Sequence, residues 1–334
     1  MSLTINHQTD DISNLTGAVT FNGVAVGGDN SPPEFFGDRG IVAGGFDTSS
    51  TSNVIQYVAI PTTGNATDFG DLTLHRYQLG AFSGEGRGVF AGGYSASGAT
   101  GQNTIDYITI STTGNATDFG DLTIANRETS GSGCSNGLRG LIGGGKSSPS
   151  GTLVSSIDYV TIATTGNAQD FGDLTGTKSH VSSCSNGSRG VFAGGNSPDI
   201  FTVVNVIEYV TIDTTGNATD FGDLTVARNG MGAAGNTTRG IFAGGGVFEG
   251  SNVIDYITIA TTGNATDFGD LITEYDIQQM AGTNNATRAI FAGGEDGGAR
   301  QNGIQYITID TTGNGTDFGD LTSVQNAAAG TSGN

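Results

Sequence analysis

The stretch TTGNATDFGDLT, residues 62–73, decides the fold of this chain because it recurs five more times with small variations. A second phrase, R-G-hydrophobic-F-A-G-G or a close variant, precedes each copy, and the step from copy to copy is close to fifty residues. The later copies begin at Thr112, Thr164, Thr214, Thr261 and Thr311. A fixed period of this length is typical of one supersecondary unit repeated as a propeller or solenoid.

One repeat divides into four predicted strands. Aliphatic and polar residues alternate in the third segment, and Gly, Asn and Thr turn residues separate the segments from one another. In the fifth unit the predicted strands are Gly230 to Gly235, Arg239 to Ala243, Val253 to Ala260 and Asp267 to Leu271. Four antiparallel strands per unit, repeated radially, predict an all-β fold, a six-bladed β-propeller.

The same residue types stand at the same places in every unit. An arginine opens an apolar strand that ends in Gly-Gly, a tyrosine lies in the next strand, and an aromatic residue lies in the last. The arginines are Arg39, Arg87, Arg139, Arg189, Arg239 and Arg288, and the tyrosines are Tyr57, Tyr107, Tyr159, Tyr209, Tyr256 and Tyr306. This pattern resembles the kelch family over roughly residues 38–334. The resemblance implies a kelch-type propeller in which the last aromatic ring packs between blades.

One feature departs from the kelch pattern. Kelch blades usually carry Trp in the fourth strand, whereas this chain contains no Trp and has Phe there, as at Phe69. We therefore interpret the chain as a divergent branch of that family.

The two ends of the repeat region predict how the ring closes. The first R-G phrase follows residues 31–38, SPPEFFGD, whose prolines are unsuited to an inner strand. After the sixth copy, residues 323–334 align with the first strand of the fifth unit. We therefore expect the C-terminal segment to pair with the strand at Ile41 to Ala43, which closes the ring and removes an open edge.

Residues 1–37 are predicted to form an N-terminal arm outside the propeller of residues 38–334. The run VTFNGVAV has an Asn-Gly turn signal between two alternating segments, which predicts a hairpin. A lone hairpin is marginal in water, so we expect the arm to attach to other proteins or to further copies of the chain. The candidate attachment residues are Val19, Phe21, Val24 and Val26.

Charge and composition exclude several partners. The net charge of −20 opposes binding to nucleic acid and to anionic lipid. The N-terminus has no basic start followed by an apolar run, and no stretch approaches a membrane span, so neither a signal peptide nor membrane insertion is expected. Cys134 and Cys184 stand at equivalent places in neighbouring repeats and are predicted to be buried free thiols.

The loops divide into a constant and a variable set. The turns after strands one and three are nearly the same in every repeat, whereas the loops after strands two and four differ in length and sequence. In an up-and-down blade each set lies on one face, so recognition is predicted on the variable face.

The cations support this choice of face. The six repeated arginines are explained by a structural ion pair or carbonyl contact, and the other six cations fall in the variable loops beside several aromatic residues. This grouping predicts a site for an acidic or carbohydrate ligand, and the alternative is that these loops are simply solvated. The candidate residues are Arg76, Tyr77, Tyr94, Arg127, Lys146, Lys178, Phe201, Arg228, Tyr275 and Arg300.

Other chemistries find little support in the sequence. The spacing of oxygen ligands in the repeat does not match a calcium loop, and Asx-turn capping explains these residues without metal. The only histidines are His7, His75 and His180, so a copper site of Tyr, His and Cys ligands is not formed. No nucleophile with a paired base can be assembled. We therefore expect no cofactor, no metal and no catalysis.

The overall style of the chain resembles propeller-bearing structural proteins of marine and cyanobacterial bacteriophages. It is rich in Ser, Thr, Gly and Asn, poor in Lys, and has the arm ISNLTGAVTFNGVAVGG ahead of the repeats. The resemblance implies a non-enzymatic virion protein, a tail fibre, knob or capsid decoration, whose arm contacts other virion proteins while the propeller meets a host glycan or protein. A cellular kelch interaction module and a carbohydrate-active enzyme are the alternatives.

Overall fold

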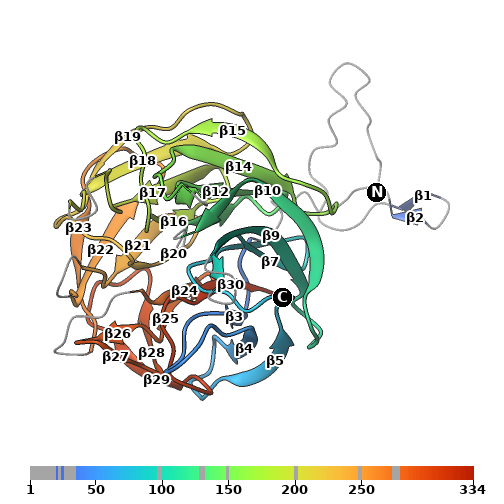
Figure 1. Ribbon diagram of the computed structural model, residues 1–334. Coiled ribbons are helices and arrows are strands. Elements are labelled where there is room, and N and C mark those ends of the chain that lie inside the picture. Colours follow the sequence, from blue (N-terminus) through green and yellow to red (C-terminus); the bar gives the residue numbers. More distant parts are fainter. Residues whose placement is uncertain are drawn as a thin grey trace. The chain divides into compact units, whose positions relative to one another are not determined.

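Six antiparallel sheets surround a central axis, and Figure 1 shows them as the blades of one ring. This computed structural model describes residues 20–21, 24–25, 35–95, 100–127, 132–147, 150–198, 202–246, 250–272 and 279–334. The predicted all-β, six-bladed propeller with four antiparallel strands per blade is confirmed. Within the described ranges, no helix has the length and apolar character needed to cross a membrane.

The blades are numbered along the chain, and the strands of each blade follow from the innermost to the outermost. Blade 1 has β30 (Ala329–Gly333), β3 (Arg39–Ala43), β4 (Val54–Ala59) and β5 (Thr67–Asp71). Blade 2 has β6 (Gly80–Gly84), β7 (Arg87–Ala91), β9 (Thr100–Thr109) and β10 (Thr117–Arg127). Blade 3 has β11 (Gly133–Ser135), β12 (Arg139–Gly143), β14 (Ser156–Thr161) and β15 (Gln169–Asp173).

The second half of the ring follows the same order. Blade 4 has β16 (Ser182–Ser185), β17 (Arg189–Ala193), β18 (Val206–Thr211) and β19 (Thr219–Asp223). Blade 5 has β20 (Gly232–Gly235), β21 (Arg239–Ala243), β22 (Val253–Thr258) and β23 (Thr266–Asp270). Blade 6 has β24 (Ala281–Asn284), β25 (Arg288–Ala292), β28 (Gly303–Thr308) and β29 (Thr316–Asp320). The short strands β8 (Tyr94–Ser95), β13 (Lys146–Ser147), β26 (Glu295–Asp296) and β27 (Ala299–Arg300) lie in loops between the main strands.

The strands predicted for the fifth unit match blade 5 closely, with small differences at their ends. The first strand begins at Gly232 instead of Gly230, because Gly230 has a φ of 59° and cannot continue an extended strand. The third strand ends at Thr258, and the next residues form the turn that leads into the fourth.

The hydrophobic core lies between blades. In the cluster at the joint of blades 1 and 2, Ile41 and Phe69 of blade 1 pack in the same group as Phe90 and Ile108 of blade 2. Five equivalent clusters lie at the other joints. The phenylalanine that stands where kelch blades have Trp thus packs between blades, as predicted. Burial of apolar surface therefore couples each blade to its neighbours.

The C-terminal strand closes the ring. In Figure 1 the red β30 lies beside the blue β3, although they come from opposite ends of the sequence. Their antiparallel register pairs Ile41 with Thr331 and Ala43 with Ala329. The predicted closure is confirmed, and β3 has no unpaired edge.

The repeated T-T-G-N turn holds the outer edge of the preceding blade. At the joint of blades 1 and 2, the Gly114 N–H donates to the Phe69 carbonyl at 2.8 Å and the Ala116 N–H donates to the Asp71 carbonyl at 2.7 Å. The Asn115 side-chain oxygen accepts from the Asp71 N–H at 3.1 Å. Equivalent bonds recur at every joint, so each fourth strand is covered by the turn of the next blade.

This contact explains the glycine within the repeated D-F-G-D. Gly70 has a φ of 150°, and a Cβ atom there would lie 2.4 Å from the Gly114 carbonyl oxygen. Any side chain at this position would push the neighbouring turn away from the strand.

The chain divides into two compact units, Met1–Pro32 and Pro33–Asn334. In the first unit, β1 (Thr20–Phe21) pairs antiparallel with β2 (Val24–Ala25), as the predicted hairpin requires. Val19 and Val26 lie outside the described residues, as do the side chains of Phe21 and Val24. The second unit begins at Pro33, before the sequence-based boundary at residue 37, and within it the Phe35 carbonyl accepts a bond from the Ser83 hydroxyl at 2.9 Å.

We expect removal of residues 323–334 to destabilise the ring strongly, because β3 would lose its partner strand and the ring its closure. A loss of several kcal/mol corresponds to a fall in melting temperature of roughly 10 °C or more for a domain of this size. The measurement is thermal unfolding followed by circular dichroism, together with light scattering for aggregation. A chain that lacks residues 1–32 is the control and should melt as the full chain does. Equal melting of both truncated chains would contradict the role of β30.

Candidate functional site

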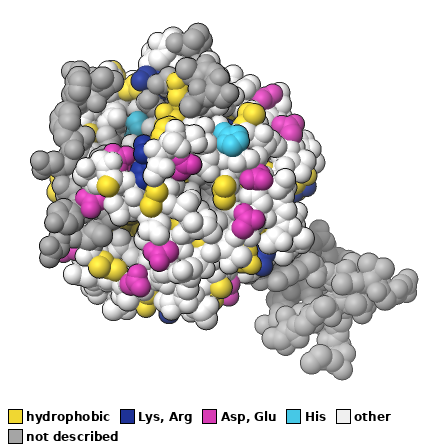
Figure 2. Space-filling model, turned by 60° about the horizontal axis from the view of Figure 1, so that its bottom comes forward, with side chains coloured by type: hydrophobic (Ala, Val, Ile, Leu, Met, Phe, Trp, Pro, Cys, Tyr) yellow, Lys and Arg dark blue, Asp and Glu magenta, His cyan; other side chains and the backbone are white. Residues whose placement is uncertain are grey.

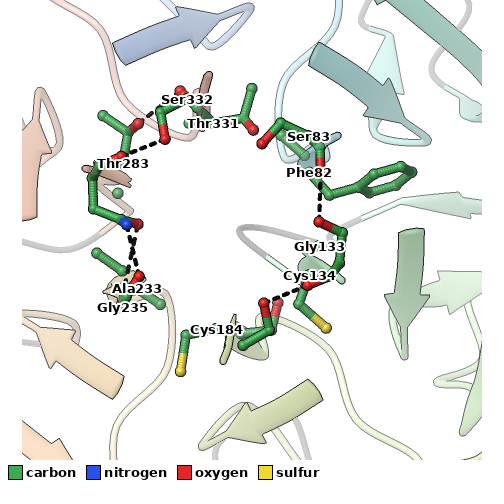
Figure 3. Close-up of a pocket in the computed structure, with 18 of the residues that line it drawn as sticks. Phe82, Ser83, Gly133, Cys134, Cys184, Ala233, Gly235, Thr283, Thr331 and Ser332 are labelled. Carbon is green, nitrogen blue, oxygen red and sulfur yellow. Dashed lines mark hydrogen bonds between the residues drawn. The ribbon is translucent and has the colours of Figure 1, made fainter. Parts of the chain in front are cut away.

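The central channel is lined by the innermost strands and is tied together by polar side chains. The Ser135 hydroxyl donates to the Ser83 carbonyl at 2.5 Å, and the Ser185 hydroxyl donates to the Ser135 carbonyl at 2.6 Å. The Asn284 amide donates to the Gly235 carbonyl at 2.7 Å, and the Ser332 hydroxyl donates to the Asn284 carbonyl. Figure 3 shows Ser83, Gly235 and Ser332 among the residues arranged around the opening.

The space inside this ring of hydrogen bonds is small. The cavity has a volume of about 60 Å³, and Phe35 lines it together with the innermost strands. This is room for a few water molecules and not for an organic ligand. The hydroxyls of the channel are used to hold neighbouring blades, so we assign the channel a structural role.

The six repeated arginines also join blades. The Arg87 guanidinium lies 4.6 Å from the centre of the Tyr107 ring in its own blade, and its Nη1 donates to the Ile162 carbonyl in the next blade at 2.8 Å. The same two contacts recur for the other five arginines. The predicted structural carbonyl contact is confirmed, and the cation–π contact is an addition to it.

Three of the cations predicted for a ligand site are buried inside the propeller. Arg76 Nη2 lies 2.6 Å from Asp106 Oδ2, and Arg228 Nη2 lies 2.7 Å from Asp255 Oδ2, with all four side chains at most 1 % exposed. Lys178 forms an equivalent pair with Glu208. The prediction that these cations form an exposed ligand surface is therefore wrong.

Each of these cations bridges two blades. The Arg228 carbonyl accepts a bond from the Gly195 N–H of blade 4, while its Nη1 donates to the carbonyls of Gly244 and Val253 in blade 5, both at 2.7 Å. Burial lowers the pKa of the Arg228 guanidinium, and the adjacent Asp255 carboxylate opposes this effect. The ion pair compensates a charge that would otherwise be costly to bury.

A signal for these pairs was present in the sequence. The cation follows the repeated DFGDL by a few residues, and the acid stands next to the repeated tyrosine of the following blade. Blade 1 has the uncharged Gln56 at the place of the acid. The connection that leads into blade 1 has the uncharged Gln325 at the place of the cation. Both places are charged at three joints and both are uncharged where Gln325 precedes Gln56, whereas Asp158 is an exception because the equivalent place before it is Asn126. Such paired change is expected of contacting residues and not of solvated loops.

Asp158 occupies the same place in blade 3, but no cation is paired with it among the described residues. Its carboxylate accepts bonds from the Thr123 hydroxyl at 2.7 Å and from the Thr123 N–H at 2.8 Å. Burial raises the pKa of Asp158, and these two hydrogen bonds only partly oppose the increase. The ionised carboxylate is therefore a cost to the folded state.

The structure brings together Tyr77, Tyr94 and Arg300 from the predicted set, and it adds Phe46. The Tyr77 ring centre lies 5.4 Å from that of Tyr94 and 5.5 Å from that of Phe46, both in edge-to-face geometry. The Arg300 guanidinium lies 4.5 Å from the centre of the Phe46 ring. We call these four residues the aromatic strip. All four are partly exposed, so they form a surface that combines apolar rings with one cation.

The aromatic strip joins three blades. Phe46 comes from the loop between β3 and β4 of blade 1. Tyr77 comes from the connection between blades 1 and 2, and Tyr94 comes from β8 in blade 2. Arg300 comes from β27 in blade 6, and its Nε also lies 3.4 Å from the Asn326 side-chain oxygen. Sequence reasoning missed Phe46, although its place directly after Gly44-Gly45 puts it at the start of a variable loop.

The remaining predicted residues are not gathered with this strip by any described contact. Lys146 is partly exposed in β13, whose backbone pairs with the end of β10. Phe201, Tyr275 and the side chain of Arg127 fall outside the described residues.

Figure 2 shows one face of the molecule, on which acidic side chains are spread widely and cationic side chains are few. The view contains histidine side chains, and both described histidines, His75 and His180, belong to the variable connections after fourth strands. The visible surface is mostly uncharged and polar. No continuous basic area appears on its described part, in agreement with the burial of Arg76, Lys178 and Arg228.

The two cysteines are free and buried, as predicted. Burial raises the pKa of the Cys134 thiol to about 12, and burial also raises the pKa of Cys184. Both are therefore protonated, unreactive thiols at neutral pH. Among the described side chains, no group of three or more His, Cys, Asp or Glu residues is placed to hold a metal ion.

No protein-family model matches the chain, and no curated protein matches it.

We expect Arg228→Ala to lower the free energy of unfolding by about 3–5 kcal/mol, because it leaves Asp255 buried without its cation. The measurement is chemical denaturation at neutral pH. Arg300→Ala is the control, since Arg300 is partly exposed, and it should change stability by less than about 1 kcal/mol. Equal effects of both substitutions would show that the buried pair contributes no more than a surface cation.

The raised pKa of Asp158 predicts a pH dependence of stability. The folded state binds the proton more tightly than the unfolded state, so this group favours folding below its ordinary pKa of 3.8 and loses that contribution as the pH rises through the raised value. Asp158→Asn should therefore be neutral at low pH and stabilising near pH 7. The amide oxygen can serve both Thr123 donors, as the Gln56 side-chain oxygen does for Thr322.

Asp255→Asn is the matched control for this prediction. It removes the partner of Arg228 and should destabilise the protein at pH 7. Denaturation curves for both variants between pH 3 and pH 8 provide the measurement. Destabilisation by Asp158→Asn near pH 7 would mean that a cation stabilises this carboxylate in the folded protein.

Proposed function

We propose that this protein is a non-enzymatic structural protein of a bacteriophage virion that displays a propeller for recognition of a host surface. The observation that carries the proposal is the division of the chain into a short N-terminal unit and a ring that is closed by its own C-terminal strand. A ring closed in this way needs no partner for its fold, so the N-terminal unit is available for attachment. The resemblance of the arm and the repeat style to phage propeller proteins supports the same function.

The aromatic strip is the proposed recognition surface of the ring. Aromatic rings with an adjacent Arg are enriched where protein surfaces bind partners, because they bury a large area and lose little conformational entropy. Tyr94 and Arg300 are partly exposed, and they belong to loops that differ from blade to blade. A host glycan or protein would contact this strip by ring stacking and by hydrogen bonds to Arg300.

We also propose that the ring is a divergent kelch propeller. The paired placement of Arg87 over Tyr107 gives a physical reason for the basic residue and the tyrosine of the repeated pattern. The Phe at the kelch Trp position keeps the packing between blades.

The attachment role of the arm is tested with a chain that begins at Pro33. This chain should remain folded and monomeric, because the ring supplies its own closure, whereas it should fail to join phage particles. Co-sedimentation of tagged protein with particles is the measurement, and the full chain is the positive control. Normal incorporation of the shortened chain would contradict the proposed role of the arm and favour a cellular interaction module.

The recognition surface is tested by the paired substitution Tyr94→Ala and Arg300→Ala. We expect binding of the labelled ring to whole cells of susceptible marine cyanobacteria to fall by about tenfold or more, as for loss of a central contact residue. Leu138→Ala is the control, because Leu138 is 49 % exposed and lies in a turn on the opposite face. Unchanged cell binding by the double variant would contradict recognition through the aromatic strip.

A further inference from the structure

Equivalent surface hollows lie in blades 2 and 4 among the residues that the structure describes, and no residue of the aromatic strip lines them. Each has a volume of about 340 Å³, one in blade 2 and one in blade 4. Each is a shallow hollow, open to solvent, that is bordered by the end of the third strand, the T-T-G-N turn and the start of the fourth strand. In blade 2 these strands are β9 and β10 (Figure 1). Five of the seven lining residues in blade 2 are exposed, so a ligand in this hollow would be covered on one side only.

The lining of the two cavities is equivalent residue by residue. In blade 2 the cavity is lined by Tyr107, Ile108, Thr109, Thr112, Gly114, Asn115 and Thr117. In blade 4 it is lined by Tyr209, Val210, Thr211, Thr214, Gly216, Asn217 and Thr219. The complete polar set of Tyr, three Thr and Asn recurs in the sequences of blades 5 and 6, whereas blade 1 has Ala59 in place of one Thr.

Structural contacts explain only part of this repeated lining. The backbone of Gly114 and the side-chain oxygen of Asn115 hold the edge of blade 1. Among the described residues, the side-chain hydroxyls of Thr112 and Thr117 form no hydrogen bond within the chain, and both residues are exposed. These two hydroxyls are therefore available for hydrogen bonds to water or to a ligand.

The residue directly before the paired threonines is also exposed, but it is Pro61, Ser111, Ala163, Asp213, Ala260 and Asp310 in the six blades. The two threonines that follow it are the same in all six. The preceding position thus varies in chemistry, and Asp213 and Asp310 accept bonds there from Asn136 and Asn236, whereas the paired threonines keep the same hydroxyls in every blade.

The chemistry of the lining indicates the class of ligand. The cavity in blade 2 offers the hydroxyl of Tyr107, the hydroxyls of three threonines and the amide of Asn115, and no charged residue lines it. Hydroxyl and amide groups that both donate and accept suit a ligand with many hydroxyls. The net charge of −20 disfavours an anionic one.

We propose that these cavities bind neutral sugar residues, with one site in each of blades 2, 4, 5 and 6. Each site is shallow and forms mainly hydrogen bonds that compete with water, so single sites are weak, with Kd on the order of millimolar. Four sites on one ring strengthen attachment to a surface that carries many copies of the sugar, because binding at one site raises the effective concentration at the others.

Blade 3 provides a natural example of a closed site. Gln169 stands where blade 2 has Thr117, and the Tyr159 hydroxyl donates to its side-chain oxygen at 2.5 Å. The groups that face the ligand in blade 2 are therefore bonded to each other in blade 3. The change from Thr to Gln is compatible with the fold, since the T-T-G-N contacts of this blade are intact.

This difference supplies the test. Equilibrium dialysis of the full chain is carried out with labelled methyl glycosides of glucose, galactose, mannose and N-acetylglucosamine, and the sugar bound per chain is measured at saturation. We expect one or more of these sugars to bind at four sites, to lose two of them in the double variant Thr117→Gln and Thr219→Gln, and to gain one in Gln169→Thr. Ser111→Ala, next to the lining, is the control and should leave binding unchanged.

The outcomes separate this proposal from recognition by the aromatic strip. Tyr94→Ala should leave the dialysis result unchanged, because Tyr94 does not line these cavities. Saturable binding of none of the four sugars would overturn the proposal, as would a stoichiometry unaffected by the Thr→Gln substitutions. Stronger binding of methyl glucuronide than of the neutral sugars would overturn the assigned ligand class. Circular dichroism melting of each variant shows that the ring remains folded.

Discussion

The ring depends on backbone hydrogen bonds from the T-T-G-N turns to the outer edges of neighbouring blades. A fourth strand would otherwise expose a row of unpaired N–H and C=O groups, which favours aggregation. The Gly114 and Ala116 N–H groups and the Asn115 side chain satisfy this edge in blade 1, and five equivalent turns do so elsewhere. The most repeated phrase of the sequence is therefore mainly a contact between blades and only secondarily a turn.

Further polar contacts also join neighbouring blades. The repeated arginine stacks on a tyrosine of its own blade and donates to a carbonyl of the next, while the buried ion pairs join the connections to the following blades. At the axis, serine and asparagine side chains donate to neighbouring backbones. Polar contacts thus supplement the apolar clusters at each joint, as a small-residue, glycine-rich chain requires.

Much of the fold could be predicted from the sequence because one unit of about fifty residues is repeated along the chain. The strand order, the six blades and the pairing of β30 with β3 all follow from where the repeats begin and end. The candidate site was harder to predict. Arg76 and Arg228 stand in variable segments, and variability usually indicates exposure, yet their guanidinium groups are buried. Their burial depends on the partners Asp106 and Asp255, which belong to the following blade, so a single repeat does not contain both members of a pair. The aromatic strip likewise requires three blades to meet.

The buried ion pairs also influence which blades dock against each other when this chain of similar repeats folds. A chain of similar repeats is prone to docking the wrong units against each other during folding. The joints between blades differ in charge. Where blades 1 and 2 join, Arg76 is paired with Asp106. Where blades 6 and 1 join, the equivalent residues Gln325 and Gln56 are both uncharged. A ring in which the C-terminal segment docked on blade 2 would bury Asp106 opposite Gln325, at the cost of an unpaired charge. The difference between charged and uncharged joints therefore disfavours docking of the C-terminal segment on blade 2 and favours its pairing with blade 1.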